Sequence, residues 1–267
     1  MHLAILHEGR PALLRVEGPS GAPVALFLHP FPLHADAWEE MLVACAASGL
    51  CAAALDAPGF GGTPPLGSTL QMDYLADLAA CALDALGAKR AAIAGCSMGG
   101  YAAMAFAKRH PERLSSLALL CTRANADAPE ARSNRETQAA LAQEKGAQAV
   151  TAGFVPKLVA PDADATVLAR VGSLATRASA QGVADALRGM AARPDRTAEL
   201  GQWKWPTLVI AGETDQLISR AESAALAAGI RGAKLHVLPK VGHLPMIETP
   251  RETAQLLVPH LQRHIHE

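Results

Sequence analysis

Aromatic residues are scarce in this chain, because Phe, Trp and Tyr together make up only 4% of its 267 residues. Half of all residues are nevertheless hydrophobic, and much of that content is alanine. Alanine is the strongest helix former, so we interpret this composition as many short helices packed close to a sheet. The length is compatible with a single α/β sheet that carries a modest insertion.

Neither sign of charge dominates, since the chain has 24 Lys and Arg residues and 25 Asp and Glu residues, which gives a net charge of −1. No basic run marks a nucleic-acid-binding surface. The longest candidate membrane span, residues 44–58, is interrupted by Ser48, Gly49 and Asp56 and is too short to cross a bilayer. The first eight residues lack the features of a signal peptide. We therefore expect a cytoplasmic protein without nucleic-acid or membrane partners.

The five cysteines show no metal-binding or disulfide pattern. Their number is odd, their spacing is loose and no C-x-x-C pair occurs, which argues against a disulfide framework or a zinc site. All have apolar neighbours, so we expect small buried side chains. They are Cys45, Cys51, Cys81, Cys96 and Cys121. Nothing in the sequence implies a metal or another cofactor.

Short apolar runs alternate with longer helical patterns, which predicts a mostly parallel eight-stranded sheet with helices on both faces. The predicted strands cover residues 3–6, 13–16, 24–28, 51–55, 91–94, 114–120, 207–211 and 234–238. The predicted helices cover residues 37–47, capped by Asp36, 70–86, 101–109 and 220–228, and a last one from about residue 250 to the C-terminus.

The pattern changes between residues 123 and 202, where the chain is polar and alanine-rich with helical spacing and no convincing strand. Strand alternation resumes only at residue 207. We interpret this stretch as a small helical cap, residues 123–202, inserted into one core made of residues 1–122 and 203–267.

The segment Gly95-Cys96-Ser97-Met98-Gly99 matches G-x-S-x-G and lies between an apolar strand and a helix. In that setting the pentapeptide indicates a nucleophilic serine on a tight turn, with the glycines removing the Cβ atoms that would clash. Phosphate-binding loops need G-x-G-x-x-G or G-K-[ST], and neither occurs here. Cys96 precedes the apex of the turn, so we expect it to pack inward and Ser97 to be the nucleophile.

A serine nucleophile needs a base within hydrogen-bond reach. Of the ten histidines, His243 lies in a loop just after the last predicted strand, at the sheet edge where the Ser97 turn also lies. His236 falls within a strand, and His260, His264 and His266 fall on the last helix, where we expect them to be solvated. We therefore expect His243 to be the base.

The histidine in turn needs a carboxylate to hold its tautomer. Asp215 follows the strand at residues 207–211 and has the position for this role, while Glu213 is a local rival that we expect at the solvent-exposed rim. Ser97, Asp215 and His243 occur in this order along the chain, which is one of the chain orders known for serine–aspartate–histidine triads.

Two backbone N–H groups are needed to hold an oxyanion. One is expected from Met98, directly after the nucleophile. The other should come from His29-Pro30-Phe31-Pro32, the loop after the strand at residues 24–28. Proline has no N–H, so Phe31 is the expected donor. We expect His29 to brace this loop through hydrogen bonds.

Together these motifs resemble the α/β-hydrolase superfamily over nearly the whole chain, and look most like small bacterial carboxylesterases and 3-oxoadipate enol-lactonases with a helical cap. The residues that carry the resemblance are His29-Pro30-Phe31-Pro32, Asp56-Ala57-Pro58-Gly59-Phe60-Gly61, Gly95 to Gly100, Gly212-Glu213-Thr214-Asp215 and Gly242-His243. Where this chain has Pro30, the family usually has glycine, which leaves the loop conformation open. The resemblance gives Asp56 a role in loop support.

The resemblance implies hydrolysis of a small-molecule carboxylic ester or lactone through an acyl-enzyme on Ser97, without a cofactor, by a monomer or small homo-oligomer. A carbon–carbon bond hydrolase, a cofactor-free perhydrolase and a non-catalytic ligand sensor are the alternatives. Dehalogenases and epoxide hydrolases of this fold carry aspartate where this chain has Ser97. The cap arginines, among them Arg123, Arg132 and Arg135, form either a solvated helix face or a site for a substrate carboxylate.

Overall fold

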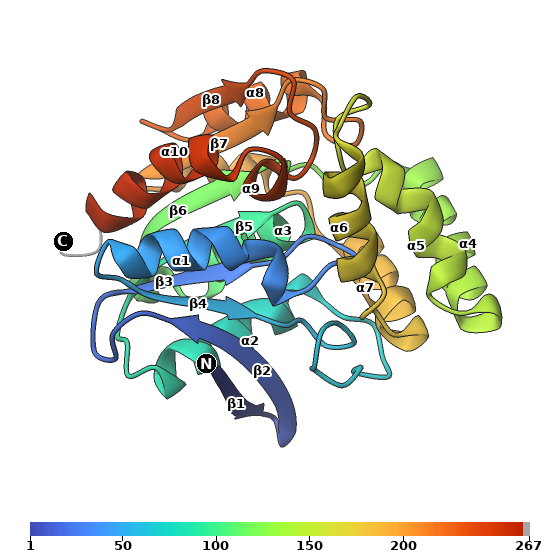
Figure 1. Cartoon of the computed structure of the whole chain (residues 1–267), viewed down its shortest axis with the longest axis horizontal. Coiled ribbons are helices and arrows are strands. Elements are labelled where there is room, and N and C mark those ends of the chain that lie inside the picture. The colour runs from blue at the N-terminus through green and yellow to red at the C-terminus, as the bar shows by residue number, and fades with distance from the viewer. Residues whose placement is uncertain (264–267) are drawn as a thin grey trace.

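The computed structural model describes residues 1–263, and its eight strands form one sheet in the order β1-β2-β4-β3-β5-β6-β7-β8 (Figure 1). Only β2 runs antiparallel to its neighbours. The prediction of a mostly parallel eight-stranded sheet is confirmed. The strands are β1 His2–His7, β2 Arg10–Glu17, β3 Val24–Leu28, β4 Cys51–Leu55, β5 Ala91–Cys96, β6 Leu114–Leu120, β7 Thr207–Gly212 and β8 Lys234–Leu238.

Helices cover both faces of the sheet, as predicted (Figure 1). Side chains of β3 alternate between two hydrophobic cores, with Ala25 and Phe27 on one side and Leu26 on the other. The first core contains α1 Glu39–Ala47, α9 Pro245–Glu248 and α10 Pro250–Arg263. The second contains α2 Met72–Ala85, α3 Met98–Arg109 and α8 Arg220–Gly229.

Alanine residues allow the helices to pack closely on the sheet, as the composition suggested. Strand β4 is buried at every position and has alanine at its three central residues. The helices α2 and α3 pack on the sheet and on each other through alanines such as Ala79 and Ala102, which are fully buried. Short side chains allow these elements to approach closely, so the core needs few aromatic rings.

The segment between β6 and β7 contains four α-helices and no strand, apart from an isolated bridge between Phe60 and Ala178. Figure 1 shows these helices grouped beyond one end of the sheet. They are α4 Pro129–Lys145, α5 Gln148–Phe154, α6 Ala165–Ala175 and α7 Ala180–Ala192. Short 3-10 turns complete the fold: η1 Ala35–Trp38, η2 Pro111–Arg113, η3 Val155–Lys157 and η4 Thr197–Gln202.

Some predicted boundaries were wrong. Helix α3 begins at Met98, three residues before the predicted start at Tyr101, because the glycines there are required by close packing and do not break the helix. Asp36 does not cap a helix; it lies within η1 and pairs with Arg15 at 2.9 Å. The single turn α9 was not predicted.

The remaining histidines are placed as follows. His236 is exposed on β8. His260, expected to be solvated, is half-buried, and its Nε2 lies 3.0 Å from the carbonyl oxygen of Leu117. His264 and His266 lie outside the described residues.

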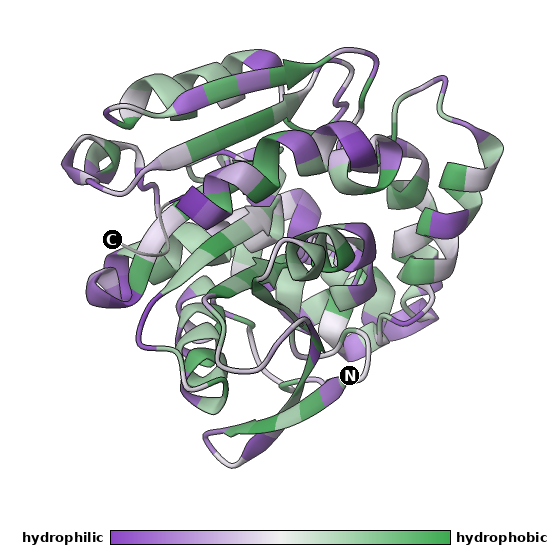
Figure 2. Cartoon of the chain, turned by 60° about the vertical axis from the view of Figure 1, so that its left-hand side comes forward, coloured by the Kyte–Doolittle hydropathy of each residue, from purple (hydrophilic) through white to green (hydrophobic). Residues whose placement is uncertain are grey.

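Figure 2 shows mostly hydrophobic strand ribbons, with hydrophilic residues gathered on helices and turns. In the part of the chain that the structure describes, no helix is both long enough and apolar enough to cross a membrane.

Candidate active site

Ser97 lies at the apex of a sharp turn between β5 and α3, with φ 53° and ψ −113°. A positive φ is unfavourable for a residue with a side chain and costs roughly 1–3 kcal/mol. The neighbouring glycines allow the turn, because a Cβ at Gly95 would lie 2.2 Å from the carbonyl oxygen of Gly99, and a Cβ at Gly99 would lie 2.0 Å from that of Leu28. The strained serine is therefore held by contacts on both sides.

The turn places Ser97 at the N-terminus of α3, where the helix dipole and free N–H groups favour negative charge. The hydroxyl of Thr122, after β6, donates to the carbonyl oxygen of Ser97 at 2.9 Å and fixes the turn from the next strand. Within the described residues, no acceptor occupies the N–H of Met98.

His243 and Asp215 come together as the sequence predicted. The imidazole Nδ1 lies 2.8 Å from Oδ2 and 3.0 Å from Oδ1 of the aspartate, and both side chains are almost fully buried. Oδ1 also accepts the N–H groups of Leu217 and Ile218 at 2.8 and 3.1 Å. Burial raises the pKa of Asp215, but His243 and these N–H groups outweigh it and lower the pKa below its usual range. The ionised carboxylate therefore fixes Nδ1 as the protonated nitrogen.

The other imidazole nitrogen, Nε2 of His243, is buried and has no hydrogen-bond partner among the described residues. Its loop lies beside the Ser97 turn, since the thiol of Cys96 donates to the carbonyl oxygen of His243 at 3.6 Å. No hydrogen bond joins Ser97 to His243 in the described part of the chain. The structure thus forms the aspartate–histidine pair directly and places the serine turn next to it.

Glu213 does not compete with Asp215 for the histidine. Its side chain is exposed, and its Oε2 accepts the backbone N–H of Lys240 at 3.0 Å. It lies at the rim of the loop, which is the position expected for it.

Glu248, which the sequence analysis missed, holds the histidine loop. Its Oε2 accepts the N–H groups of Gly242 at 2.9 Å and Ala160 at 2.8 Å, and its Oε1 accepts that of Leu244 at 2.9 Å. The carboxylate therefore accepts hydrogen bonds from the backbone on both sides of His243 and connects this loop to the segment before α6. A glutamate five residues after a histidine belongs to no motif that a single sequence would reveal.

The loop after β3 is braced by the side chains of His29 and Asp56. His29 Nε2 accepts the N–H of Ala57 at 3.0 Å, while its Nδ1 lies 3.0 Å from the carbonyl oxygen of Pro30. Asp56 accepts the N–H groups of Ala35 and Gly62 at 2.8 and 2.9 Å. Both residues thus support the loop, as expected.

Phe31, at the tip of that loop, precedes a cis peptide bond to Pro32. Its N–H has no acceptor within the described residues. Phe31 borders the same cavity as Ser97.

Two buried thiols lie under the site. Cys121 donates to the carbonyl oxygen of Gly242 at 3.8 Å, and its sulfur, the carboxylate of Asp215 and the imidazole of His243 lie within 4.8 Å of one another. Burial, and then the charge of Asp215, raise the pKa of both Cys121 and Cys96 well above the usual range. A metal requires the thiolate, so this cluster is better suited to packing beneath the aspartate–histidine pair.

The sequence profile described as α/β hydrolase fold matches residues 23–250. The chain belongs to the α/β-hydrolase family. It is a hydrolytic enzyme, in keeping with esterase and lactonase relatives. This α/β hydrolase is 28% identical over 258 residues to the pimeloyl-(acyl-carrier protein) methyl ester esterase of Chromobacterium violaceum, over 93% of this chain and 98% of that protein.

Solved structures of an esterase and an enol-lactonase are also similar to this chain. A thermophilic esterase from Thermogutta terrifontis, solved with malate bound, is similar to this α/β hydrolase with a TM-score of 0.91 and 30% identity, over 100% of both chains. The enol-lactonase from Burkholderia xenovorans LB400 is similar with a TM-score of 0.89 and 25% identity, over 97% of this chain and 100% of that one.

A cavity of about 180 Å³ adjoins the Ser97 turn of this α/β hydrolase. Its lining includes the apolar side chains of Phe31, Phe154 and Leu217 and the polar side chains of Arg123 and of three residues of α4. The rings of Phe31 and Phe154 meet edge to face with centroids 5.3 Å apart. Residues from both the core and the inserted segment therefore line the space next to Ser97.

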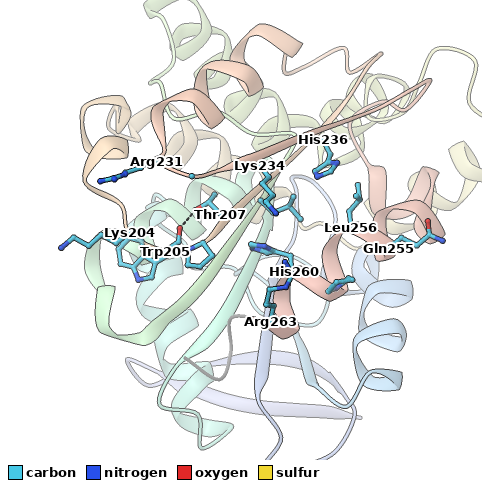
Figure 3. Close-up of a pocket in the computed structure, with 14 residues that line it drawn as sticks. Lys204, Trp205, Thr207, Arg231, Lys234, His236, Gln255, Leu256, His260 and Arg263 are labelled. Atoms are coloured by element: carbon cyan, nitrogen blue, oxygen red, sulfur yellow. Dashed lines mark hydrogen bonds between the residues drawn. The ribbon is translucent and has the colours of Figure 1, made fainter.

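A larger cavity of about 440 Å³ lies elsewhere (Figure 3). It is lined by residues at the start of β7 and β8, such as Thr207 and Lys234, together with residues of α10 such as His260. Ser97 and Asp215 follow the opposite, carboxyl ends of β5 and β7. The larger cavity is thus remote from the aspartate–histidine pair and is not the candidate active site.

Proposed function

We propose that this α/β hydrolase cleaves a carboxylic ester or lactone of a small molecule through an acyl-enzyme on Ser97. The observation that carries the proposal is the bidentate contact of His243 Nδ1 with Asp215, which leaves the buried Nε2 available as a base beside the nucleophile turn. The esterase and enol-lactonase relatives support ester or lactone chemistry.

In the first half of the reaction, His243 Nε2 takes the proton of the Ser97 hydroxyl as Oγ bonds to the substrate carbonyl carbon. The N–H groups of Met98 and Phe31 hold the oxygen that becomes negative. When the carbon–oxygen bond to the leaving group breaks, His243 gives its proton to the departing alcohol.

In the second half, His243 Nε2 removes a proton from a water molecule, whose oxygen bonds to the acyl carbon. The bond to Ser97 then breaks, the serine oxygen regains its proton from His243, and the carboxylic acid is released. Asp215 remains ionised throughout and stabilises the imidazolium that forms twice in the cycle.

We also propose that residues 123–202 act as the cap over this site. Phe154, Arg135 and Met190 of this segment border the cavity that holds Ser97. The cavity volume of about 180 Å³ is below the usual range of roughly 300–1,000 Å³ for ligand pockets, which favours short acyl groups.

The test compares the wild-type protein with Ser97→Ala in hydrolysis of 4-nitrophenyl butyrate and in labelling by a fluorophosphonate probe. We expect the variant to lose several orders of magnitude in kcat and all labelling. Ser116→Ala is the matched control, because the Ser116 hydroxyl is buried without a partner among the described residues and should be dispensable. Most of the activity remaining in Ser97→Ala, or an unlabelled wild-type protein, would refute the proposal.

A further inference from the structure

A buried aspartate accepts hydrogen bonds from three arginines next to the candidate active site. The Asp127 side chain is fully buried, and its Oδ1 accepts hydrogen bonds from Arg123 and Arg193 at 2.7 and 2.8 Å. Its Oδ2 accepts one from Arg135 of α4. Burial raises the pKa of Asp127, but hydrogen bonds from the arginines outweigh it and hold the pKa far below its usual range. The aspartate is therefore ionised at neutral pH.

The cluster has more arginines than carboxylates bonded to them. Besides Asp127, Glu222 is the one carboxylate bonded to these arginines in the described chain, and it pairs with Arg123 at 2.6 Å. Three guanidinium groups are thus bonded to two carboxylates, and the charge of a third carboxylate, Asp195, acts on Arg193 without a direct bond. Both Arg123 and Arg135 line the cavity that Ser97 borders, so two of the three guanidinium groups lie where a substrate would bind.

Arg135 has hydrogen-bond donors to spare. Arg193 uses Nη1 and Nη2 on the carbonyl oxygens of Met190 and Asn125 as well as on Asp127. Arg135 gives only Nε to Asp127, and its Nη1 meets the Sδ of Met190 at 3.6 Å, which is a weak acceptor. No partner for its Nη2 occurs among the described residues.

The rest of the α4 face that meets the cavity is also polar. Asn134, Arg135 and Gln138 all line it, and residues three and four apart lie on one side of a helix. Neither the Asn134 nor the Gln138 amide has a hydrogen-bond partner within the described residues. Phe31 and Leu217 also line the cavity, with apolar side chains. A ligand in this space would therefore meet apolar side chains and, from α4, amide groups and guanidinium donors without strong partners.

We propose that the substrates of this site are small esters or lactones that carry a carboxylate, and that Arg135 binds that carboxylate. This inference rests on the proposed function. A guanidinium pairs with a carboxylate through two parallel hydrogen bonds, and Arg135 is the arginine of this cluster whose Nη groups lack a strong acceptor.

The other arginines named from the sequence are less suited to this role. Arg132 is exposed, donates to the carbonyl oxygen of Asp127 and does not line the cavity. Arg123 lines it, but its Nη groups are paired with Glu222 and Asp127.

The first experiment measures kcat/KM of the wild-type enzyme for the mono-4-nitrophenyl ester of glutaric acid and for its uncharged counterpart, 4-nitrophenyl methyl glutarate. The two substrates share the scissile bond and differ in the distal charge. We expect the acid to be preferred by about tenfold or more, as one charge-assisted pair allows. Added salt should weaken the preference only slightly, because the Arg135 side chain is only 17% exposed and salt screens partly buried pairs much less than exposed ones.

The second experiment repeats the comparison with Arg135→Gln and Arg135→Lys. We expect Arg135→Gln to lower kcat/KM for the acid more than for the methyl ester and so to abolish the preference, and Arg135→Lys to keep part of it. Arg188→Gln is the matched control, since Arg188 is another arginine of the inserted segment, pairs with Glu136 at 2.7 Å and does not line the cavity. It should leave the ratio of the two substrates unchanged.

Equal kcat/KM for the acid and the methyl ester in the wild-type enzyme would overturn this inference, as would a preference that survives in Arg135→Gln. If both esters are still hydrolysed in a reaction that depends on Ser97, either of these results would leave the proposed function intact. Absence of Ser97-dependent hydrolysis for every ester would instead refute the proposed function itself.

Discussion

Gly59 of the core and Gly182 of α7 meet backbone to backbone. A Cβ at Gly182 would lie 2.5 Å from the Cα of Gly59, and a Cβ at Gly59 would lie 2.2 Å from the Cα of Gly182. The hydroxyl and the N–H of Ser179 both reach the carbonyl oxygen of Gly59, at 3.1 and 2.8 Å. The turn that Asp56 supports is thus a direct docking point for the inserted helices.

Substitution of Gly182 should disturb this docking point. We expect Gly182→Ala to force α7 away from the core and to destabilise the protein by about 1–3 kcal/mol, with lower activity because the cavity wall moves. Gly172→Ala, in α6, meets only Val155 Cγ1 at 4.0 Å and should be neutral or stabilising by up to about 1 kcal/mol. Thermal unfolding and kcat/KM measure both effects. Equal melting temperatures for the two variants would contradict the docking argument.

Asp215→Asn should lower kcat by roughly 10⁴ while the fold is retained, because an amide no longer selects the tautomer with the proton on Nδ1. Glu213→Gln removes a carboxylate two residues away that bonds only to the backbone of Lys240, and we expect activity near that of the wild-type enzyme. The measurement is kcat with a 4-nitrophenyl ester, with circular dichroism to verify folding. The assignment fails if the two variants lose activity equally.

Glu248→Gln should misplace His243 without touching the reacting atoms, since the amide nitrogen cannot accept the N–H groups that the carboxylate holds. A displacement of about 1 Å at a catalytic group costs about 10² in rate, so we expect kcat to fall by about that factor with KM nearly unchanged. Glu252→Gln, on the exposed side of α10, is the control. An unchanged kcat in Glu248→Gln, or a rise in KM alone, would exclude a positioning role.

The protein should lose stability as the pH falls from about 6.5 to about 4. Burial lowers the pKa of His29 from 6.5 to about 4, against the opposing effects of the Pro30 carbonyl and Asp56. In this window the unfolded chain binds a proton at His29 that the folded chain does not, so stability decreases by at most roughly 3 kcal/mol.

Urea unfolding at pH 7 and pH 4.5 measures this loss. In His29→Gln it should be smaller than in the wild-type protein, whereas the exposed His2→Gln should behave as the wild type does. Parallel pH profiles for wild type and His29→Gln would show that another group is responsible.

The number of strands and the mostly parallel character of the sheet could be predicted from the sequence, because each strand is a short apolar run followed by turn residues. The spatial order, in which β4 lies between β2 and β3, was not predicted. The Ser97 turn could be identified because G-x-S-x-G combines glycines, which a tight turn requires, with a serine that can act as a nucleophile. Asp215 could be predicted as the partner of His243 because it follows β7, and the structure places its Oδ2 2.8 Å from His243 Nδ1.

Contacts between segments far apart in the chain were not predictable. Glu248 bonds to Ala160, and Asp127 to Arg193, across 88 and 66 residues, and neither pair leaves a local pattern. The start of α3 was misplaced because Gly99 and Gly100 have low intrinsic helix propensity, whereas their close contacts with Leu28 and Thr122 admit no other residue.

The burial of four cysteines has a practical consequence. Cys45, Cys51, Cys96 and Cys121 are buried, while Cys81 is half-exposed and donates to Leu6 in the edge strand β1. A maleimide fluorophore should therefore attach at Cys81 first, on the margin of the sheet and away from Ser97. The native chain thus offers a single attachment point for spectroscopy of the enzyme, with no cysteine to be removed by mutation.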